Sequence, residues 1–176
     1  MKSPKLWDTH NPYLYDLEVV LYNNGKETDR IKSYAAMRKV SAQRDKDGFM
    51  RFQLNNKDIF HFGPLDQGWW PDGLYTPPSD EAMLYDVQKT KELGFNLIRK
   101  HIKVEPARWY TYCDRMGILV WQDMPSGDAY PKWEPFVYNG GEEVKRSAES
   151  DATYRKEWKE IMDHLMPYPC IQVWTP

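Results

Sequence analysis

The stretch 94–125 restricts the possible folds of this chain more than any other part of the sequence. Two short apolar runs, 95–98 and 118–121, flank a segment whose apolar side chains recur at helical spacing. Pro106 suits the first position of that helix, and Gly117 suits a left-handed end. Two apolar strands joined by an amphipathic helix predict a βαβ unit, with parallel strands that are buried on both faces.

Polar side chains follow both predicted strands. Arg99 and His101 come directly after the first strand, and Asp123 comes directly after the second. The carboxyl ends of parallel strands meet at one edge of a sheet, where α/β proteins hold their ligands. The sequence therefore predicts a ligand site at this edge that contains these three residues.

The alternation of strand and helix continues on both sides of this unit. Apolar strands are centred near Phe60, Leu97, Val120 and Val173, and a helix is predicted between each neighbouring pair. The first of these strands is expected over 59–62. This (βα)₃β order predicts an α/β fold, the first half of a (β/α)₈ barrel of the TIM type.

The N-terminal part, 1–56, has the period of two that is typical of β-strands. A strand over 13–21 is followed by Asn-Asn-Gly at 23–25, which predicts a type I′ hairpin turn. Further strands are expected over 28–42 and 49–54. These strands are too few to close a β-sandwich, and a sheet of this size is marginally stable alone.

Composition excludes several classes of partner. The 176-residue chain has a formal net charge of −2 and no lysine or arginine cluster, so we expect no nucleic-acid partner. No apolar run approaches the roughly 20 residues of a membrane span, so no membrane partner is expected. The N-terminus lacks the apolar core of a signal peptide. Localisation stays unknown, since a longer parent protein could still be secreted or periplasmic.

Ligand patterns for metals and phosphates are not recognisable. His61, His101 and His164 are isolated, and no set of histidine, cysteine and carboxylate residues has zinc spacing. No glycine-rich phosphate loop is present. We therefore expect no metal and no cofactor. Cys113 and Cys170 are interpreted as buried thiols rather than a disulfide.

Aromatic residues make up 15% of the chain, with 8 Trp and 12 Tyr. A large aromatic core and a sugar-binding cleft both explain this content, because aromatic rings pack well on the apolar faces of sugar rings. Trp69, Trp70 and Trp133 lie in predicted loops, the last in the long stretch 126–148. For these three, sugar stacking and loop packing both remain open.

Several motifs together resemble one family. They are Leu-Trp at 6–7 with Asn-Pro-Tyr-Leu-Tyr at 11–15, the stretch 48–63, Gly-Phe-Asn-Leu-Ile-Arg at 94–99 and Leu-Val-Trp-Gln-Asp-Met-Pro at 119–125. In this order they resemble the glycoside hydrolase family 2 enzymes, the β-galactosidase, β-glucuronidase and β-mannosidase group. The resemblance covers nearly the whole chain.

The resemblance implies a fragment of a retaining hydrolase that cleaves O-glycosidic bonds of β-linked sugars. It implies terminal strands of an immunoglobulin-like β-sandwich over 1–44, and strands 1–4 of the barrel over 45–176. Retaining enzymes need two carboxyl groups about 5 Å apart, a nucleophile and an acid/base. In the family both are glutamates on later segments, expected beyond Pro176. No catalytic residue is therefore assigned in this chain, which we expect to be inactive alone.

The remaining predictions concern carbohydrate contacts. Asp66 and Asp123 could bond sugar hydroxyls; alternatively, they could pair with Arg99 or cap loop amides. The resemblance implies that Arg99 orients a catalytic carboxylate; a salt bridge at the edge of the core is the alternative. His101 could hold a sugar hydroxyl or be purely structural. The predicted substrate-binding residues are Arg99, His101, Asp123, Trp121, Asp66, Trp69 and Trp70.

Two other classes of function stay open, a non-catalytic carbohydrate-binding module and a structural fragment. A half barrel leaves open strand edges, which are pairing sites for another copy, so a homo-oligomer through these edges is expected. The sugar, its linkage and the role of the loop 126–148 are not determined by the sequence.

Overall fold

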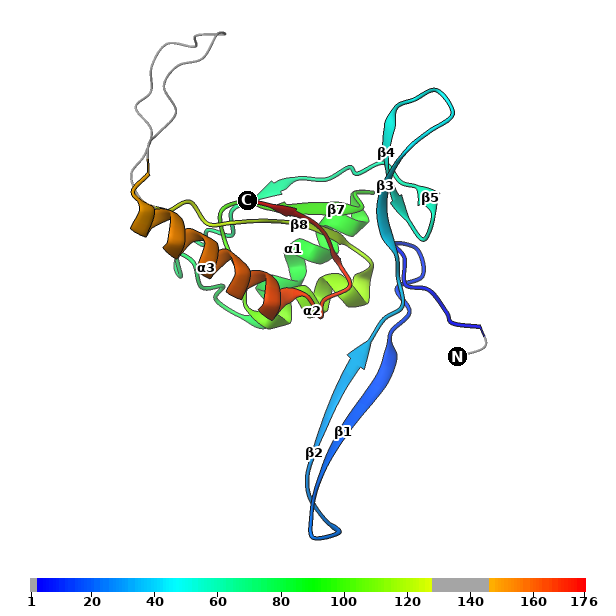
Figure 1. Ribbon diagram of the computed structural model, residues 1–176, viewed down its shortest axis with the longest axis vertical. Coiled ribbons are helices and arrows are strands. Elements are labelled where there is room, and N and C mark those ends of the chain that lie inside the picture. Colours follow the sequence, from blue (N-terminus) through cyan, green and yellow to red (C-terminus); the bar gives the residue numbers. More distant parts are fainter. Residues whose placement is uncertain (1–2, 128–145) are drawn as a thin grey trace.

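The computed structural model describes residues 3–127 and 146–176 and has a mixed α/β fold (Figure 1). Its body is a four-stranded parallel sheet in the order β6-β7-β8-β9. Strands and helices alternate along the chain as β6 (Leu65–Asp66), α1 (Asp80–Glu92), β7 (Leu97–Lys100), α2 (Ala107–Met116), β8 (Leu119–Asp123), α3 (Ala148–Leu165) and β9 (Ile171–Thr175). Because sequential parallel strands are joined by right-handed crossovers, the helices lie on one side of the sheet (Figure 1). The predicted βαβ unit is confirmed.

Local sequence explains where the helices of the body begin and end. The Ser79 hydroxyl accepts a hydrogen bond from the Ala82 amide at 3.1 Å and caps α1. Pro106 is the N-cap of α2 rather than its first residue, and Gly117 ends that helix with a φ of 69°. α3 begins at Ala148, before the predicted apolar stripe, because Ser147 caps it through the Ser150 amide at 3.0 Å.

The core lies between the sheet and its helices. Buried apolar side chains of α1 and α2 pack on the two central strands and on the start of β9. This core contains Met83, Val87, Leu97, Ile98, Trp109, Cys113, Ile118, Leu119, Val120, Leu165, Cys170 and Ile171. Both cysteines are free thiols and are buried, as predicted.

The N-terminal part forms two antiparallel sheets. β1 (Tyr15–Asn23) pairs with β2 (Lys26–Ala35), and β3 (Val40–Arg44) pairs with β4 (Met50–Leu54), which pairs with β5 (Lys57–Asp58). The predicted hairpin turn is confirmed, since both of its central residues have positive φ. The β1–β2 hairpin extends away from the body (Figure 1).

The prediction of one strand over 28–42 is wrong, because the chain leaves the sheet between β2 and β3. Arg38 lies in this break and points its guanidinium at the loop before β9. Its Nε donates to the Pro169 carbonyl at 2.5 Å, and its Nη2 donates to the Ile171 carbonyl at 2.7 Å. The backbone in this break bonds to other segments instead of β1, since the Met37 carbonyl accepts from the Trp7 amide at 2.8 Å and the Lys39 carbonyl accepts from the Asn55 amide at 2.8 Å.

The prediction of the first parallel strand over 59–62 is also wrong. Phe60 is 81% exposed, and the strand that pairs with β7 is β6, further along the chain. Gly63 comes so close to β7 that a Cβ would lie 1.7 Å from the Leu97 carbonyl oxygen. Pro64 then accepts from the Arg99 amide at 3.0 Å but has no N–H to donate. Regular strand pairing therefore begins only after the proline.

The N-terminal segment 3–14 packs against the body at the end opposite the carboxyl edge of the sheet. Trp7 is fully buried, and its Nε1 donates to the Asp114 carbonyl oxygen on α2 at 2.7 Å. The Asn55 side chain donates to the Trp7 carbonyl at 3.0 Å.

Within 3–127 and 146–176, no helix is long and apolar enough to cross a membrane.

Candidate functional site

Three of the predicted site residues meet at the carboxyl edge of the parallel sheet. Arg99 and Asp123, at the ends of β7 and β8, form a bidentate ion pair, with Nε to Oδ1 at 3.1 Å and Nη2 to Oδ2 at 2.9 Å. The Asp123 side chain is 5% exposed and that of Arg99 is 38% exposed. A planar guanidinium fork fixes the carboxylate in one orientation. Because Arg99 is partly exposed, the ion pair stays accessible to a ligand from the Arg99 side.

His101 joins this pair from the residue after β7. Its Nε2 lies 3.9 Å from Asp123 Oδ2, and its Nδ1 lies 2.9 Å from the Gln67 amide nitrogen. An amide nitrogen is a donor only, so Nδ1 accepts and we assign the hydrogen of the neutral ring to Nε2. The imidazole thus directs an N–H toward the carboxylate, where it can also reach a ligand hydroxyl.

Trp121 forms part of the sheet face that lies opposite the helices. It is in register with Arg99 on the neighbouring strand, and its Nε1 donates to His61 Nδ1 at 3.0 Å. The His61 ring stacks on Phe52 of β4 at 4.6 Å between centroids. Burial lowers the pKa of His61, so this ring stays neutral near pH 7.

No sequence signal connects Phe52 and His61 with the site. Phe52 falls within the strand expected over 49–54, and His61 is one of the isolated histidines. The contact of both with Trp121 depends on how the β3–β4 hairpin folds over the sheet, and no local pattern encodes it.

Asp66 lies on the other side of the sheet from Asp123. Side chains alternate between the two faces of a strand, so Lys100 points away from Arg99 and toward the helices. The fully buried Lys100 ammonium lies 2.5 Å from Asp66 Oδ2 and 2.8 Å from Glu105 Oε1. Asp66 Oδ1 accepts from the Gly68 amide at 2.7 Å, which is the loop-capping alternative.

The β6–α1 loop carries the two predicted tryptophans. Trp69 is 55% exposed, and its ring lies 4.2 Å from that of Tyr75. Trp70 is half-buried and exchanges backbone hydrogen bonds with Leu74 at 2.8 and 2.9 Å. Trp133, for which the sequence leaves both sugar stacking and loop packing open, lies outside the described residues, as does most of the predicted loop 126–148.

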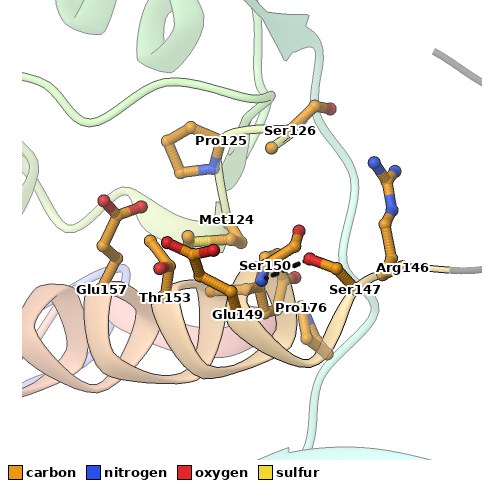
Figure 2. A pocket seen from close by; sticks show the side chains of 12 residues that line it. Met124, Pro125, Ser126, Arg146, Ser147, Glu149, Ser150, Thr153, Glu157 and Pro176 are labelled. Atoms are coloured by element: carbon orange, nitrogen blue, oxygen red, sulfur yellow. Dashed lines mark hydrogen bonds between the residues drawn. The ribbon is translucent and has the colours of Figure 1, made fainter. Parts of the chain in front are cut away.

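A hollow of about 590 Å³ lies beside this edge, between the segment after β8 and the first turns of α3. Figure 2 shows the side chains of Glu149, Thr153 and Glu157 on the side of α3 that faces Met124 and Pro125. None of the predicted site residues lines it. Its lining borders the residues that the structure does not describe, so we assign it no ligand.

No metal site is found in the part of the chain that the structure describes, where no three histidine, cysteine or carboxylate side chains lie close enough to hold an ion. The Lys100 network also differs from a metal site, because its carboxylates are already paired with buried ammonium groups.

Comparison with known proteins gives consistent matches. The family model described as "Glycosyl hydrolases family 2" matches residues 1–38. A β-galactosidase of Lactococcus lactis is 31% identical over 123 residues, which is 67% of this chain and 11% of that protein. A β-mannosidase B of Aspergillus clavatus is 30% identical over 188 residues, covering 99% of this chain and 20% of that protein.

Solved structures share the fold across the chain. A β-glucuronidase 2 of Bacteroides uniformis has a TM-score of 0.75 at 25% identity and covers 97% of this chain and 18% of its own. A β-galacturonidase of Eisenbergiella tayi, bound to galacturonate, has a TM-score of 0.77 at 22% identity, and the match covers 97% of this chain and 28% of the galacturonidase chain. The chain spans 11% to 20% of the length of the curated relatives described above.

Proposed function

The chain belongs to glycosyl hydrolase family 2, and on that premise we propose that it forms part of a retaining glycoside hydrolase acting on β-linked sugars. The observation that carries this proposal is the Arg99–Asp123 pair, with His101 beside it, at the carboxyl edge of a parallel sheet. That edge is where barrel enzymes bind substrate. Relatives named for their action on galactosides, glucuronides and mannosides support a carbohydrate as the partner.

We further propose two domains, strands of an immunoglobulin-like sandwich over 1–44 and the first half of a TIM barrel over 45–176. The projecting β1–β2 hairpin and the sequential parallel order of β6 to β9 support this division. β3 pairs with β4 across the boundary, so the hairpin that they form would link the domains.

Within the sugar pocket, each edge residue has a distinct role. Arg99 holds Asp123 in one orientation, and both present polar atoms to sugar hydroxyls. His101 donates from Nε2, and Trp121 provides an aromatic wall. Asp66 is held by Lys100 and Gly68, so its contribution is to fix the start of the loop that carries Trp69 and Trp70.

The isolated 176-residue chain is proposed to be inactive. Retaining hydrolysis needs two carboxyl groups about 5 Å apart on one side of the substrate. Asp123 is bound by Arg99, and Asp66 lies on the opposite face of the sheet. We expect no turnover of nitrophenyl β-glycosides by this chain. Turnover at the rate of a complete enzyme would contradict the proposal.

The positive test is to extend the coding sequence beyond Pro176 and assay the longer product on nitrophenyl β-glycosides. We expect hydrolysis with retention of configuration, and Arg99→Ala should lower kcat/KM about a hundredfold, because a displaced carboxylate misplaces the sugar. Arg108→Ala is the matched control, since it breaks a surface ion pair with Asp80 (2.7 Å) on the helix side. Equal activities of both variants would remove Arg99 from the site.

A non-catalytic carbohydrate-binding fragment is the second candidate. The exposed Trp69 and Tyr75 rings favour it, because exposed aromatic faces suit sugar rings. Two results together would support this binding function. The 176-residue chain would bind an oligosaccharide in calorimetry, and the protein extended beyond Pro176 would show no hydrolysis.

A further inference from the structure

We propose that Trp69 and Tyr75 form a preorganised stacking platform for a pyranose ring, and that buried Lys103 is the positioning residue that holds this platform in place. The inference rests on the proposed carbohydrate function and deepens it. It assigns a role to the buried Lys103 ammonium group, which is not part of the edge cluster formed by Arg99, His101 and Asp123.

Lys103 binds both arms of the β6–α1 loop. Its Nζ donates to the Gly68 carbonyl at 2.7 Å and to the Tyr75 carbonyl at 2.8 Å. Its third partner is Glu105 Oε1 at 3.0 Å, and the side chain is only 7% exposed. Two of its three N–H donors are therefore satisfied by loop carbonyls, and the ion pair with Glu105 adds a charged partner. Because Gly68 directly precedes Trp69, these two bonds fix the backbone on either side of the aromatic pair.

The loop is closed further by its own backbone. Trp70 and Leu74 exchange two hydrogen bonds, and the Thr76 amide donates to the Gly73 carbonyl at 2.9 Å. Gly68 has a φ of +63°, and a Cβ there would lie 2.3 Å from Glu105 Oε1 and 2.6 Å from Lys103 Nζ. The loop therefore approaches Lys103 so closely that only glycine fits.

This anchoring leaves the aromatic rings outside. Trp69 is 55% exposed and Tyr75 is 47% exposed, although their rings are in contact. The Lys103 ammonium also lies 5.2 Å from the centre of the Tyr75 ring. Two large rings held at the surface by a rigid loop gain binding affinity, because little conformational freedom is lost when a ligand binds.

The platform is continuous with the edge cluster. The loop starts at Gln67, whose amide contacts His101, and His101 faces Asp123. A sugar on the platform would therefore lie beside the unit held by the cluster. The ligand class is a β-linked oligosaccharide, since a pyranose offers an apolar ring face to the aromatics and hydroxyls to the cluster.

The test follows the Trp69 indole N–H resonance and amide hydrogen exchange in the 176-residue chain by NMR. The probes are cellotetraose and mannotetraose, and sorbitol is the control because it has hydroxyls but no ring face. We expect the Trp69 signal to shift with at least one tetrasaccharide and not with sorbitol. Absence of any shift would overturn the platform, and because turnover is not measured, this result leaves the hydrolase proposal to its own assay.

Lys103→Met tests the positioning role. It removes both loop bonds, while Glu105 keeps the Lys100 ammonium at 2.8 Å as its partner. We expect the Trp70 and Leu74 amides to exchange at least about tenfold faster and the tetrasaccharide shift to be lost, because charge-assisted bonds to the loop are broken.

Two further variants complete the design. Gly68→Ala pushes Lys103 away from the loop side, should have the same effect, and serves as the test if Lys103→Met does not fold. Lys91→Met is the matched control, since its ammonium binds the Thr9 carbonyl far from this loop. Wild-type exchange and binding in the first two variants, or equal losses in the control, would overturn the role of Lys103.

Discussion

At the scale of single residues, Asp114 brings together parts of the chain that are far apart in sequence. Its carboxylate accepts from the Tyr34 hydroxyl at 2.6 Å and from the Cys170 amide at 2.8 Å, and its side chain is fully buried. Arg38 is the nearby cation, and burial lowers the pKa of its guanidinium. Burial raises the pKa of Asp114 to about 6, although the Cys170 and Tyr34 bonds and the Arg38 charge act in the opposite direction.

This raised pKa predicts a pH-dependent stability. Between pH 3.8 and about 6 the folded protein keeps a proton on Asp114 that the unfolded chain has lost, so the free energy of unfolding falls as pH rises. The fall across this window is about 3 kcal/mol, because each pKa unit between the folded and unfolded states corresponds to roughly 1.4 kcal/mol. The variant Asp114→Asn has no carboxylate at this position and should not show this fall. The unfolding free energy of the wild type minus that of the variant, measured by urea denaturation, should therefore decline across this window.

Tyr34→Phe provides the control for the cause. It removes a hydrogen bond that favours the charged carboxylate, so the folded-state pKa rises and the upper end of the window should move to higher pH. A wild-type profile parallel to that of Asp114→Asn from pH 4 to 7 would contradict the assignment to Asp114.

At the scale of elements, the N-terminal segment 3–14 is tied to the body by few contacts. The Trp7 ring fills a space under α2, and the Lys91 ammonium binds the Thr9 carbonyl. Gly117 allows this close approach, because a Cβ there would lie 2.8 Å from the Thr9 carbonyl oxygen. Trp7 and Thr9 are the buried positions of this segment, so these two residues anchor it to the body.

Trp7→Ala should lower the free energy of unfolding by about 3–5 kcal/mol, because it empties a fully buried site. Guanidinium denaturation measures this loss. The matched control is Trp69→Ala, which removes a half-exposed ring and should cost about 1 kcal/mol or less. A loss at Trp7 as small as the one expected at Trp69 would show that the segment does not stabilise the body.

At the scale of the whole molecule, the parallel sheet has two open edges. Among the described residues, the edge strands β6 and β9 each pair with one strand only. Large apolar side chains lie exposed near β6, including Phe60 at 81%, Leu93 at 72% and Leu65 at 53%. Open edges and apolar patches of this kind promote association.

We therefore expect the 176-residue chain to form a dimer or larger oligomer at micromolar concentration, measured by light scattering. Leu65→Lys should shift the chain toward monomer, because a charge on an edge strand opposes pairing. Met166→Lys is the control, since it changes an exposed side chain after α3. A wild-type chain that is a monodisperse monomer would refute the prediction.

The sequence alone determined the elements whose signals are local. Gly117 marks a helix end, the apolar runs mark β7 and β8, and Asn24-Gly25 marks a turn. Strand order then placed Arg99, His101 and Asp123 at one edge, because consecutive parallel strands end on the same side. These predictions depend only on neighbouring residues and on chain direction.

Tertiary structure decided everything that depends on distant partners. Strand 28–42 is interrupted where the Met37 and Lys39 carbonyls accept from the amides of distant segments, and the strand that pairs with β7 begins only at Leu65. Asp66 and Asp123 follow strands in the same way, yet Lys100 holds one and Arg99 the other. The periodicity of the sequence does not show which cation each carboxylate will meet. These ion pairs join residues of different strands, and they form only when the chain folds and brings the strands together.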